Sequence, residues 1–176
     1  MKKISEMDAA ELSAYVQSHL KKAGIEVVLS GGSVVTIYSQ SKYVSKDLDL
    51  VNIYASSYKK IKALMMELSF QEDGRYFAHP DTHLFIEFPA GPLAIGEEAI
   101  SNIIEKEMET GILRIISPTD CVKDRLAAYY HWGDLQCLVQ AGYVSQAQEV
   151  DLQEIEAWSK REGMLEKFGE IKKKLS

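Results

Sequence analysis

The sequence predicts an α+β protein of the α/β type, with a mixed sheet of about five strands flanked by helices and followed by further helices. Over the first 116 residues, apolar stretches of strand length alternate with amphipathic helical stretches. The residues from 117 to 176 read as helical throughout. Hydrophobic residues make up 46% of the 176 residues, which is enough to build a core.

The first region is predicted to run in the order helix, strand, helix, strand, helix, two strands, helix, strand. Its opening helix, MDAAELSAYVQSHLKKAG, places Leu12, Val16 and Leu20 on one face, and Gly24 ends it. We expect the strands IEVVLS (25–30), KDLDLVNI (46–53), RYFAH (75–79), HLFIEF (83–88) and ILRIIS (112–117), and helices that begin at Ser33, at Ser56 or Ser57, and at about Glu97, the last ending near Glu109.

The second region is predicted to hold four helices. Ser117 is expected to cap the first of them, with Pro118 at its first position and Asp120 in its first turn. The helices are expected in SPTDCVKDRLAAYYHW, DLQCLVQAGYV, EVDLQEIEAWSKREG and MLEKFGEIKKKL. The chain is therefore expected to divide into 1–116 and 117–176.

Composition excludes several classes of function. The net charge of -6 disfavours sequence-independent binding of long nucleic acid, which needs a basic face. The N-terminal segment lacks the apolar run of a signal peptide, and no stretch reaches about 18 apolar residues, so we expect a cytoplasmic protein with no membrane partner. Cys121 and Cys137 do not form a Cys-x-x-Cys pair and are expected to be reduced and buried.

Gly31, Gly32 and Ser33 follow the first apolar strand. Glycines at such a turn allow positive φ and a close approach of the backbone to a ligand. If a helix starts at Ser33, its free amide groups favour an anion above the turn. The turn alone is a weak signal, because many ordinary strand–helix connections contain glycine for packing reasons.

Asp47 and Asp49 lie on one face of the second strand, with Leu48 and Leu50 on the other. Two neighbouring carboxylates repel each other, and a divalent cation such as Mg²⁺ relieves that repulsion. The alternative is an exposed face with two solvated aspartates. The 13 residues between Ser33 and Asp47 leave room for one helix, so the turn and the carboxylates are expected at the same end of the sheet.

The combination resembles the nucleotidyltransferase superfamily, which has the polymerase-β-like fold. The resemblance is carried by Ser30-Gly31-Gly32-Ser33 and by Asp47-Leu48-Asp49-Leu50. Ser30 departs from the pattern, because the family has an apolar residue there. The family adds a third carboxylate on a later strand, and Glu87 in HLFIEF is the candidate by position and context.

The resemblance implies a nucleotidyltransferase-fold catalytic domain over 1–116 and a helical region over 117–176 that completes its cleft. Gly31, Gly32 and Ser33 would bind the phosphates of a nucleoside triphosphate, ATP foremost. Asp47, Asp49 and Glu87 would be the catalytic and metal-binding residues and would hold two Mg²⁺ ions, with transfer of a nucleoside monophosphate to a hydroxyl and release of pyrophosphate.

The helical region resembles that of small bacterial and archaeal nucleotidyltransferase-like proteins, some of them associated with toxin–antitoxin or abortive-infection systems. Lys123 is the basic candidate for the triphosphate, and Lys46 a second. Tyr130 lies seven residues beyond Lys123 and either borders the base or packs in the core. Lys123, Asp124 and Arg125 read alternatively as an exposed charged turn.

Two other functions stay open at the level of the sequence. One is a non-catalytic nucleotide-binding or toxin–antitoxin partner protein of the same fold, and the other is a metal-dependent phosphohydrolase. The acceptor is open among a protein hydroxyl, an RNA end and a small molecule. His79 and His83 are a weak zinc candidate, because Pro80 and Asp81 place a turn between them.

Overall fold

The computed structural model describes all residues from 1 to 176. Helices and strands alternate up to residue 67, only strands follow up to residue 116, and the second region is helical, as the sequence predicts. Besides a short 3-10 helix (Ile4–Glu6), the chain forms seven α-helices: α1 (Ala9–Lys22), α2 (Gly32–Tyr38), α3 (Tyr58–Glu67), α4 (Pro118–Trp132), α5 (Leu135–Ala147), α6 (Leu152–Arg161) and α7 (Leu165–Leu175).

Seven strands form one mixed sheet in the order β3-β4-β5-β2-β1-β9-β8. β1 runs antiparallel to β2 and parallel to β9, and β2 runs parallel to β5. The strands are β1 (Val27–Ser30), β2 (Asp47–Asn52), β3 (Gln71–Asp73), β4 (Tyr76–Ala78), β5 (Phe85–Glu87), β8 (Ile103–Met108) and β9 (Gly111–Ile116), and a separate pair consists of β6 (Ala94–Ile95) and β7 (Glu98–Ala99).

The sheet has two strands more than the sequence predicts. The helix expected from about Glu97 to Glu109 is wrong, because this segment forms β7 and β8. β8 pairs antiparallel with β9, from Ile103 opposite Ile116 to Met108 opposite Gly111. Its Glu and Lys residues favour a helix locally, but pairing with β9 prevails, and those charges suit an exposed edge strand. β3 is the second addition, and it pairs with β4.

The helical ends follow ordinary capping chemistry. Asp8 caps α1 and Ser117 caps α4, each side chain accepting a hydrogen bond from a backbone amide three residues later. Pro118 occupies the first position of α4, as expected. Gly24, in the left-handed region, follows the end of α1.

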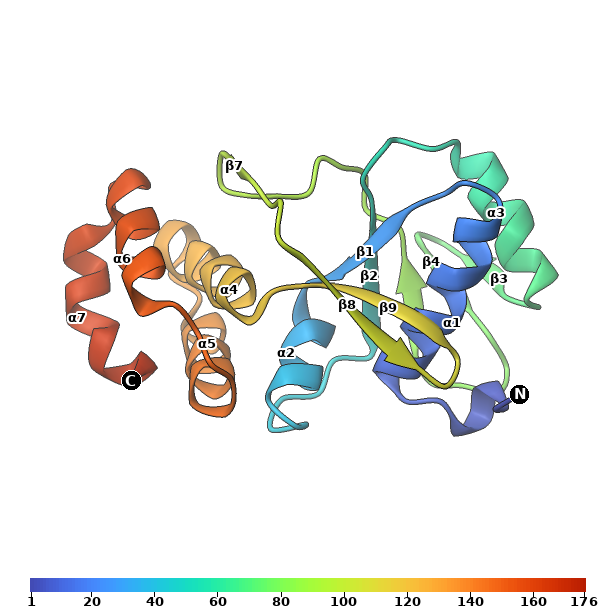
Figure 1. The fold of residues 1–176 in the computed structure, drawn as a ribbon, viewed down its shortest axis with the longest axis horizontal. Coiled ribbons are helices and arrows are strands. Elements are labelled where there is room, and N and C mark those ends of the chain that lie inside the picture. The colour runs from blue at the N-terminus through green and yellow to red at the C-terminus, as the bar shows by residue number, and fades with distance from the viewer.

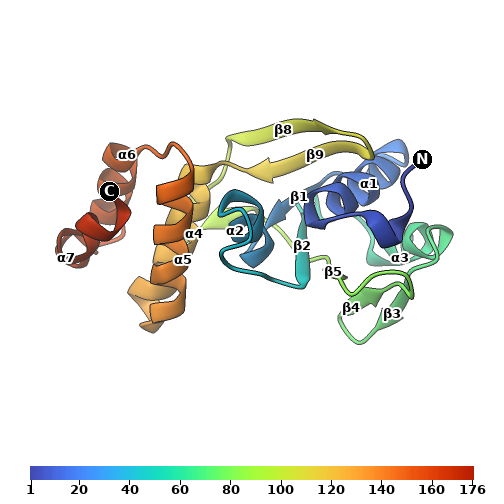
Figure 2. The same cartoon turned by 90° about the horizontal axis from the view of Figure 1, so that it is seen from below.

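The four C-terminal helices gather at one end of the molecule, with the sheet, α1 and α3 at the other (Figure 1). α2 lies between these two parts and beside α5, which Figure 2 shows from below. The Tyr38 hydroxyl at the end of α2 donates a 2.7 Å hydrogen bond to the Ile116 carbonyl, and the Gln148 side chain donates to the Tyr38 carbonyl at 3.0 Å. Buried residues from both parts belong to one hydrophobic cluster, so α2 is held firmly in position.

None of the helices combines the length and the hydrophobicity that crossing a membrane would need.

Candidate functional site

The two aspartates of β2 share one face of the sheet. Leu48 and Leu50 are fully buried on the opposite face, whereas Asp47 and Asp49 are half-buried. The period-2 alternation of a strand produces this division, so the burial of the two leucines fixes the direction of the two carboxylates.

Glu87 lies on the strand next to this pair. β5 runs parallel to β2, with Asp47 opposite Phe85 and Asp49 opposite Glu87. Residues in register on neighbouring strands point to the same side, so Glu87 joins the face that carries the aspartates. Its side chain is 25% exposed. The structure thus brings together the three carboxylates that the sequence singles out.

Gly31 brings the backbone against the middle carboxylate. β1 pairs with β2 so that Ser30 lies opposite Asp49, and the next residue turns away with a φ of 76°. A Cβ atom on Gly31 would lie 2.2 Å from the Oδ2 atom of Asp49. Both the conformation and the space therefore require glycine at this position.

α2 begins at Gly32, directly after this turn. Ser33 is fully buried, and its hydroxyl faces the Ser30 carbonyl at 3.4 Å. The structure therefore offers backbone amides of the first helical turn at this end of the sheet and directs the Ser33 hydroxyl inward. The Ser45 hydroxyl accepts a 3.2 Å hydrogen bond from the Asp47 amide and holds the start of β2.

Burial and like charge act together on Asp49. Burial raises the pKa of Asp49 to about 6, and the neighbouring carboxylates of Glu87 and Asp47 add to the shift. Arg125 opposes it and Asp124 adds a little. The ionised form of Asp49 is therefore less favourable in the folded protein than in a free aspartate, and a nearby cation would stabilise it.

Two arginines, which the sequence analysis missed as site residues, lie close to this face. Arg75 Nε is 3.7 Å from Glu87 Oε1, and the Arg75 side chain is 72% exposed. Arg125 on α4 is largely buried, contacts Asp124, and donates to Gln140 Oε1 at 3.3 Å. Sequence features could have indicated both arginines. Asp73-Gly74 is typical of a hairpin turn, and this turn carries Arg75. Arg125 lies one helical turn after Cys121, which is buried, so it falls on the same side of the helix.

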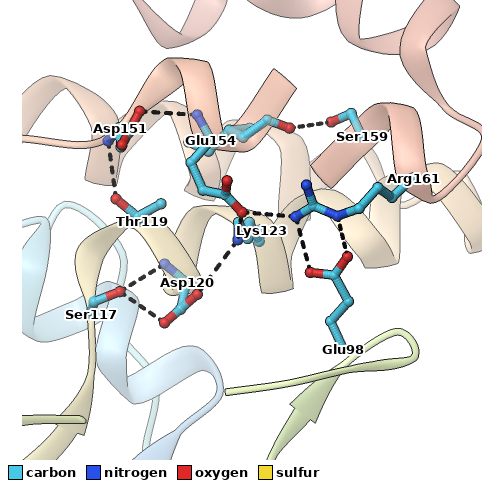
Figure 3. A network of polar contacts seen from close by, with 10 residues as sticks. Glu98, Ser117, Thr119, Asp120, Lys123, Asp151, Glu154, Ser159 and Arg161 are labelled. Atoms are coloured by element: carbon cyan, nitrogen blue, oxygen red, sulfur yellow. Dashed lines mark hydrogen bonds and ion pairs between the residues drawn. The ribbon is translucent and has the colours of Figure 1, made fainter. Parts of the chain in front are cut away.

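Lys123 lies elsewhere, in a network of charges that joins α4, α6 and β7 (Figure 3). Its Nζ is 2.8 Å from Glu154 and 3.9 Å from Asp120, and its side chain is 9% exposed. Arg161 Nη2 lies 2.8 Å from the same glutamate and also pairs with Glu98. To contact a triphosphate Lys123 would have to leave Glu154, so its role in nucleotide binding stays a prediction.

The other sequence candidates have ordinary environments. Lys46 is exposed beside the site. Tyr130 is buried, donates or accepts a 2.9 Å hydrogen bond with Ser159, and stacks on Trp158, so it packs in the core. His79 is buried against Phe70. Cys121 and Cys137 are free and buried, as expected.

The three carboxylates fit Mg²⁺ by their chemistry, and they lie on one face of the sheet. Oxygen ligands suit this hard cation, and burial together with the charges of Glu87 and Asp47 raises the pKa of Asp49, which a bound cation would oppose. The side chains share a face without being drawn together, since no group of three or more His, Cys, Asp or Glu side chains has the spacing of a metal site. Binding would need rotamer changes at this face.

Comparison with known proteins adds information on the fold. No model of a known protein family matches the sequence, and neither does any curated protein. Among solved structures, the chain is similar to the solution structure of the antibiotic-resistance factor ANT(2'')-Ia, with a TM-score of 0.54 and 11% identity over 92% of this chain and 96% of that chain.

A crystal structure of ANT(2'')-Ia in complex with adenylyl-2''-tobramycin gives a TM-score of 0.40 and 13% identity, over 76% of this chain and 95% of that one. The likeness to the solution structure shows that this chain shares the fold of ANT(2'')-Ia, which supports the nucleotidyltransferase-type fold expected from the sequence. The α+β class is confirmed, with seven strands in the main sheet instead of about five.

Proposed function

We propose that this chain is a Mg²⁺-dependent nucleotidyltransferase that moves a nucleoside monophosphate from a nucleoside triphosphate, ATP foremost, to a hydroxyl acceptor and releases pyrophosphate. The observation that carries the proposal is the environment of Asp49. Its carboxylate lies against the Gly31 turn on one side and opposite Glu87 on the other, with Asp47 on the same face.

The strand order supports a phosphate-binding side and an acceptor-binding side around Asp49. β1 and the Gly31–Ser33 turn flank β2 on one side, and β5 with Glu87 flanks it on the other. Amides at the start of α2 would hold phosphate oxygens, whereas Glu87 would face the acceptor and take the proton of its hydroxyl. The acceptor oxygen would form a bond to the α-phosphorus, and the bond from that phosphorus to pyrophosphate would break.

Asp47 and Asp49, joined by Glu87, would hold the metal ions. Bound there, Mg²⁺ would neutralise the triphosphate and the departing pyrophosphate. The backbone contact at Gly31 fixes where the Asp49 carboxylate lies relative to the phosphate-binding turn, which is a positioning effect. The helical region 117–176 completes the cleft in this proposal, through Arg125 and α5.

The test is transfer of label from α-labelled nucleoside triphosphates in the presence of Mg²⁺ and cell lysate. We expect label on an acceptor with the native protein and none with the double variant Asp47→Ala/Asp49→Ala. Glu156→Gln, an exposed carboxylate on α6, is the matched control and should keep the activity. Nucleotide binding without any Asp-dependent label would favour a binding protein, and release of inorganic phosphate would favour a phosphohydrolase.

A further inference from the structure

A groove of about 460 Å³ lies beside the candidate site, between the loop after α2 and the exposed side of α5. Lys42 and Tyr43 form one wall, and Leu135, Gln140 and Tyr143 belong to the other. Lys42 Nζ is 6.0 Å from the centroid of the Tyr143 ring, so the two walls face each other. Apolar side chains of this wall face solvent, with Leu135 67% and Val139 53% exposed.

The groove adjoins the candidate site in two places. A Cβ atom on Gly32 would lie 3.4 Å from Cε1 of the Tyr43 ring, so this ring packs beside the proposed phosphate-binding turn. Gln140 accepts a 3.3 Å hydrogen bond from Arg125, whose charge acts on Asp49. A molecule that occupied the turn could therefore extend directly into the groove.

The chemistry of the lining selects the kind of ligand. Two tyrosine rings and the aliphatic side chains offer flat apolar contact, the glutamines offer amide groups, and Lys42 is the one charged residue. With no carboxylate in the lining, a polycation finds no counter-charge here. A planar heteroaromatic ring with polar edges finds both stacking surface and hydrogen-bond partners.

We propose that this groove binds the base of the nucleoside triphosphate and favours a purine. The inference rests on the proposed function and names the residues that would recognise the substrate of that site. A purine offers a larger face to Tyr43 than a pyrimidine does. Because the Gln140 carbonyl oxygen already accepts from Arg125, its amide nitrogen is the group left to donate to a ring nitrogen of the base.

The test compares binding of Mg²⁺–ATP with binding of Mg²⁺–inorganic triphosphate, measured by titration calorimetry. The native protein should bind ATP more tightly. Tyr43→Ala should weaken ATP binding about tenfold, within the range of base stacking on an aromatic side chain, and leave triphosphate binding unchanged. Tyr43→Phe, which keeps the ring, should bind both ligands like the native protein.

A second variant approaches the groove from the other wall. Val139 is half exposed, so Val139→Glu should fold normally and place a carboxylate in the groove. It should weaken ATP binding and spare triphosphate binding, and ATP and GTP should bind the native protein more tightly than CTP and UTP.

Two results would overturn this inference while leaving the proposed function standing: triphosphate binding as tight as ATP binding, or ATP binding unchanged by both Tyr43→Ala and Val139→Glu. Failure of ATP and triphosphate alike to bind with Mg²⁺ would instead remove the proposed function, and this inference with it.

Discussion

Asp49 and Glu154 are both partly buried carboxylates, but the protein treats them in opposite ways. Lys123 and Arg161 hydrogen-bond to Glu154 and lower its pKa, whereas burial and the charges of Glu87 and Asp47 raise the pKa of Asp49. The network around Glu154 supplies cations from its own helices (Figure 3). The face of β2 gathers three carboxylates, and no cation pairs directly with Asp49, although Arg75 lies near Glu87 and Arg125 acts on Asp49 from a distance. The first arrangement joins elements together, and the second is suited to an external cation.

The largest expected effect comes from a substitution at Gly31, whose backbone lies against Asp49. Asp49 and Asp47 form the β2 face, the side of β2 that carries both carboxylates. Gly31→Ala would push a methyl group into the Asp49 carboxylate and should lower the rate of nucleotidyl transfer about hundredfold, since small displacements of reacting groups cost that much. Gly24→Ala is the matched control, because its φ of 77° is nearly the same and no atom lies within 4 Å of its added Cβ. Gly24→Ala should lose about 1 kcal/mol of unfolding free energy, and Gly31→Ala should lose more because its methyl group also meets the Asp49 carboxylate. Equal transfer rates in the two would refute the role of the contact.

A substitution in the charge network around Glu154 should lower the free energy of unfolding and leave the rate of nucleotidyl transfer unchanged. Glu154→Gln removes the closest partner of the buried Lys123 ammonium and should lower the free energy of unfolding by about 2 kcal/mol, measured by urea denaturation. On the same helix, the exposed pair of Glu156 with Lys172 serves as control, and Glu156→Gln should change stability by less than about 0.5 kcal/mol. Transfer per folded molecule should be unchanged in Glu154→Gln. A loss of transfer with stability intact would place Glu154 and Lys123 in the site.

The pH dependence of Mg²⁺ binding should follow Asp49. Because the pKa of Asp49 is about 6, the carboxylate is mostly ionised above pH 7 and protonated below pH 5, so protons compete with the metal in the acidic range. The apparent affinity for Mg²⁺ in calorimetry should fall up to tenfold for each pH unit below 6 and stay level between pH 7.5 and 8.5. A level affinity down to pH 5 would show that Asp49 is not a ligand.

The smallest expected effect is on the unfolding free energy of the metal-free protein, which ionised Asp49 lowers. The raised pKa means that the free folded protein holds the Asp49 proton more tightly than the unfolded chain does, so this group favours folding at low pH and loses that contribution as pH rises through 6. Asp49→Asn should therefore stabilise the metal-free protein by about 1 kcal/mol at pH 8 and by less at pH 4.5. The exposed Asp73→Asn should show no such gain.

Much of the β2 face could be predicted from the sequence because strand alternation and chain spacing determine it. Leu48 and Leu50 must be buried, which directs Asp47 and Asp49 together, and the segment between Ser33 and Asp47 is long enough for one short helix. The apolar neighbours of Glu87 in HLFIEF predict that it lies within a strand, and the register of β5 puts it opposite Asp49.

What the sequence could not predict depends on how segments pair and pack in the folded chain. The residues of β8 favour a helix, and only their pairing with β9 makes them a strand. Arg75 reaches Glu87 because β3, β4 and β5 are neighbours in the sheet, an arrangement that the sequence between the two residues does not specify. Lys123 looked available for phosphate, because its partner Glu154 comes from a helix 31 residues later.

Arg75 has a consequence for how the β2 face would accept a metal. Its guanidinium lies at the tip of a hairpin, stacked on the Tyr76 ring at 4.8 Å and within 3.7 Å of Glu87. A metal ion that bound Glu87 would therefore have to displace the Arg75 guanidinium from it. Metal binding at Glu87 would then depend on the position of the β3–β4 hairpin. The displaced guanidinium would be free to bind an anion near the acceptor hydroxyl.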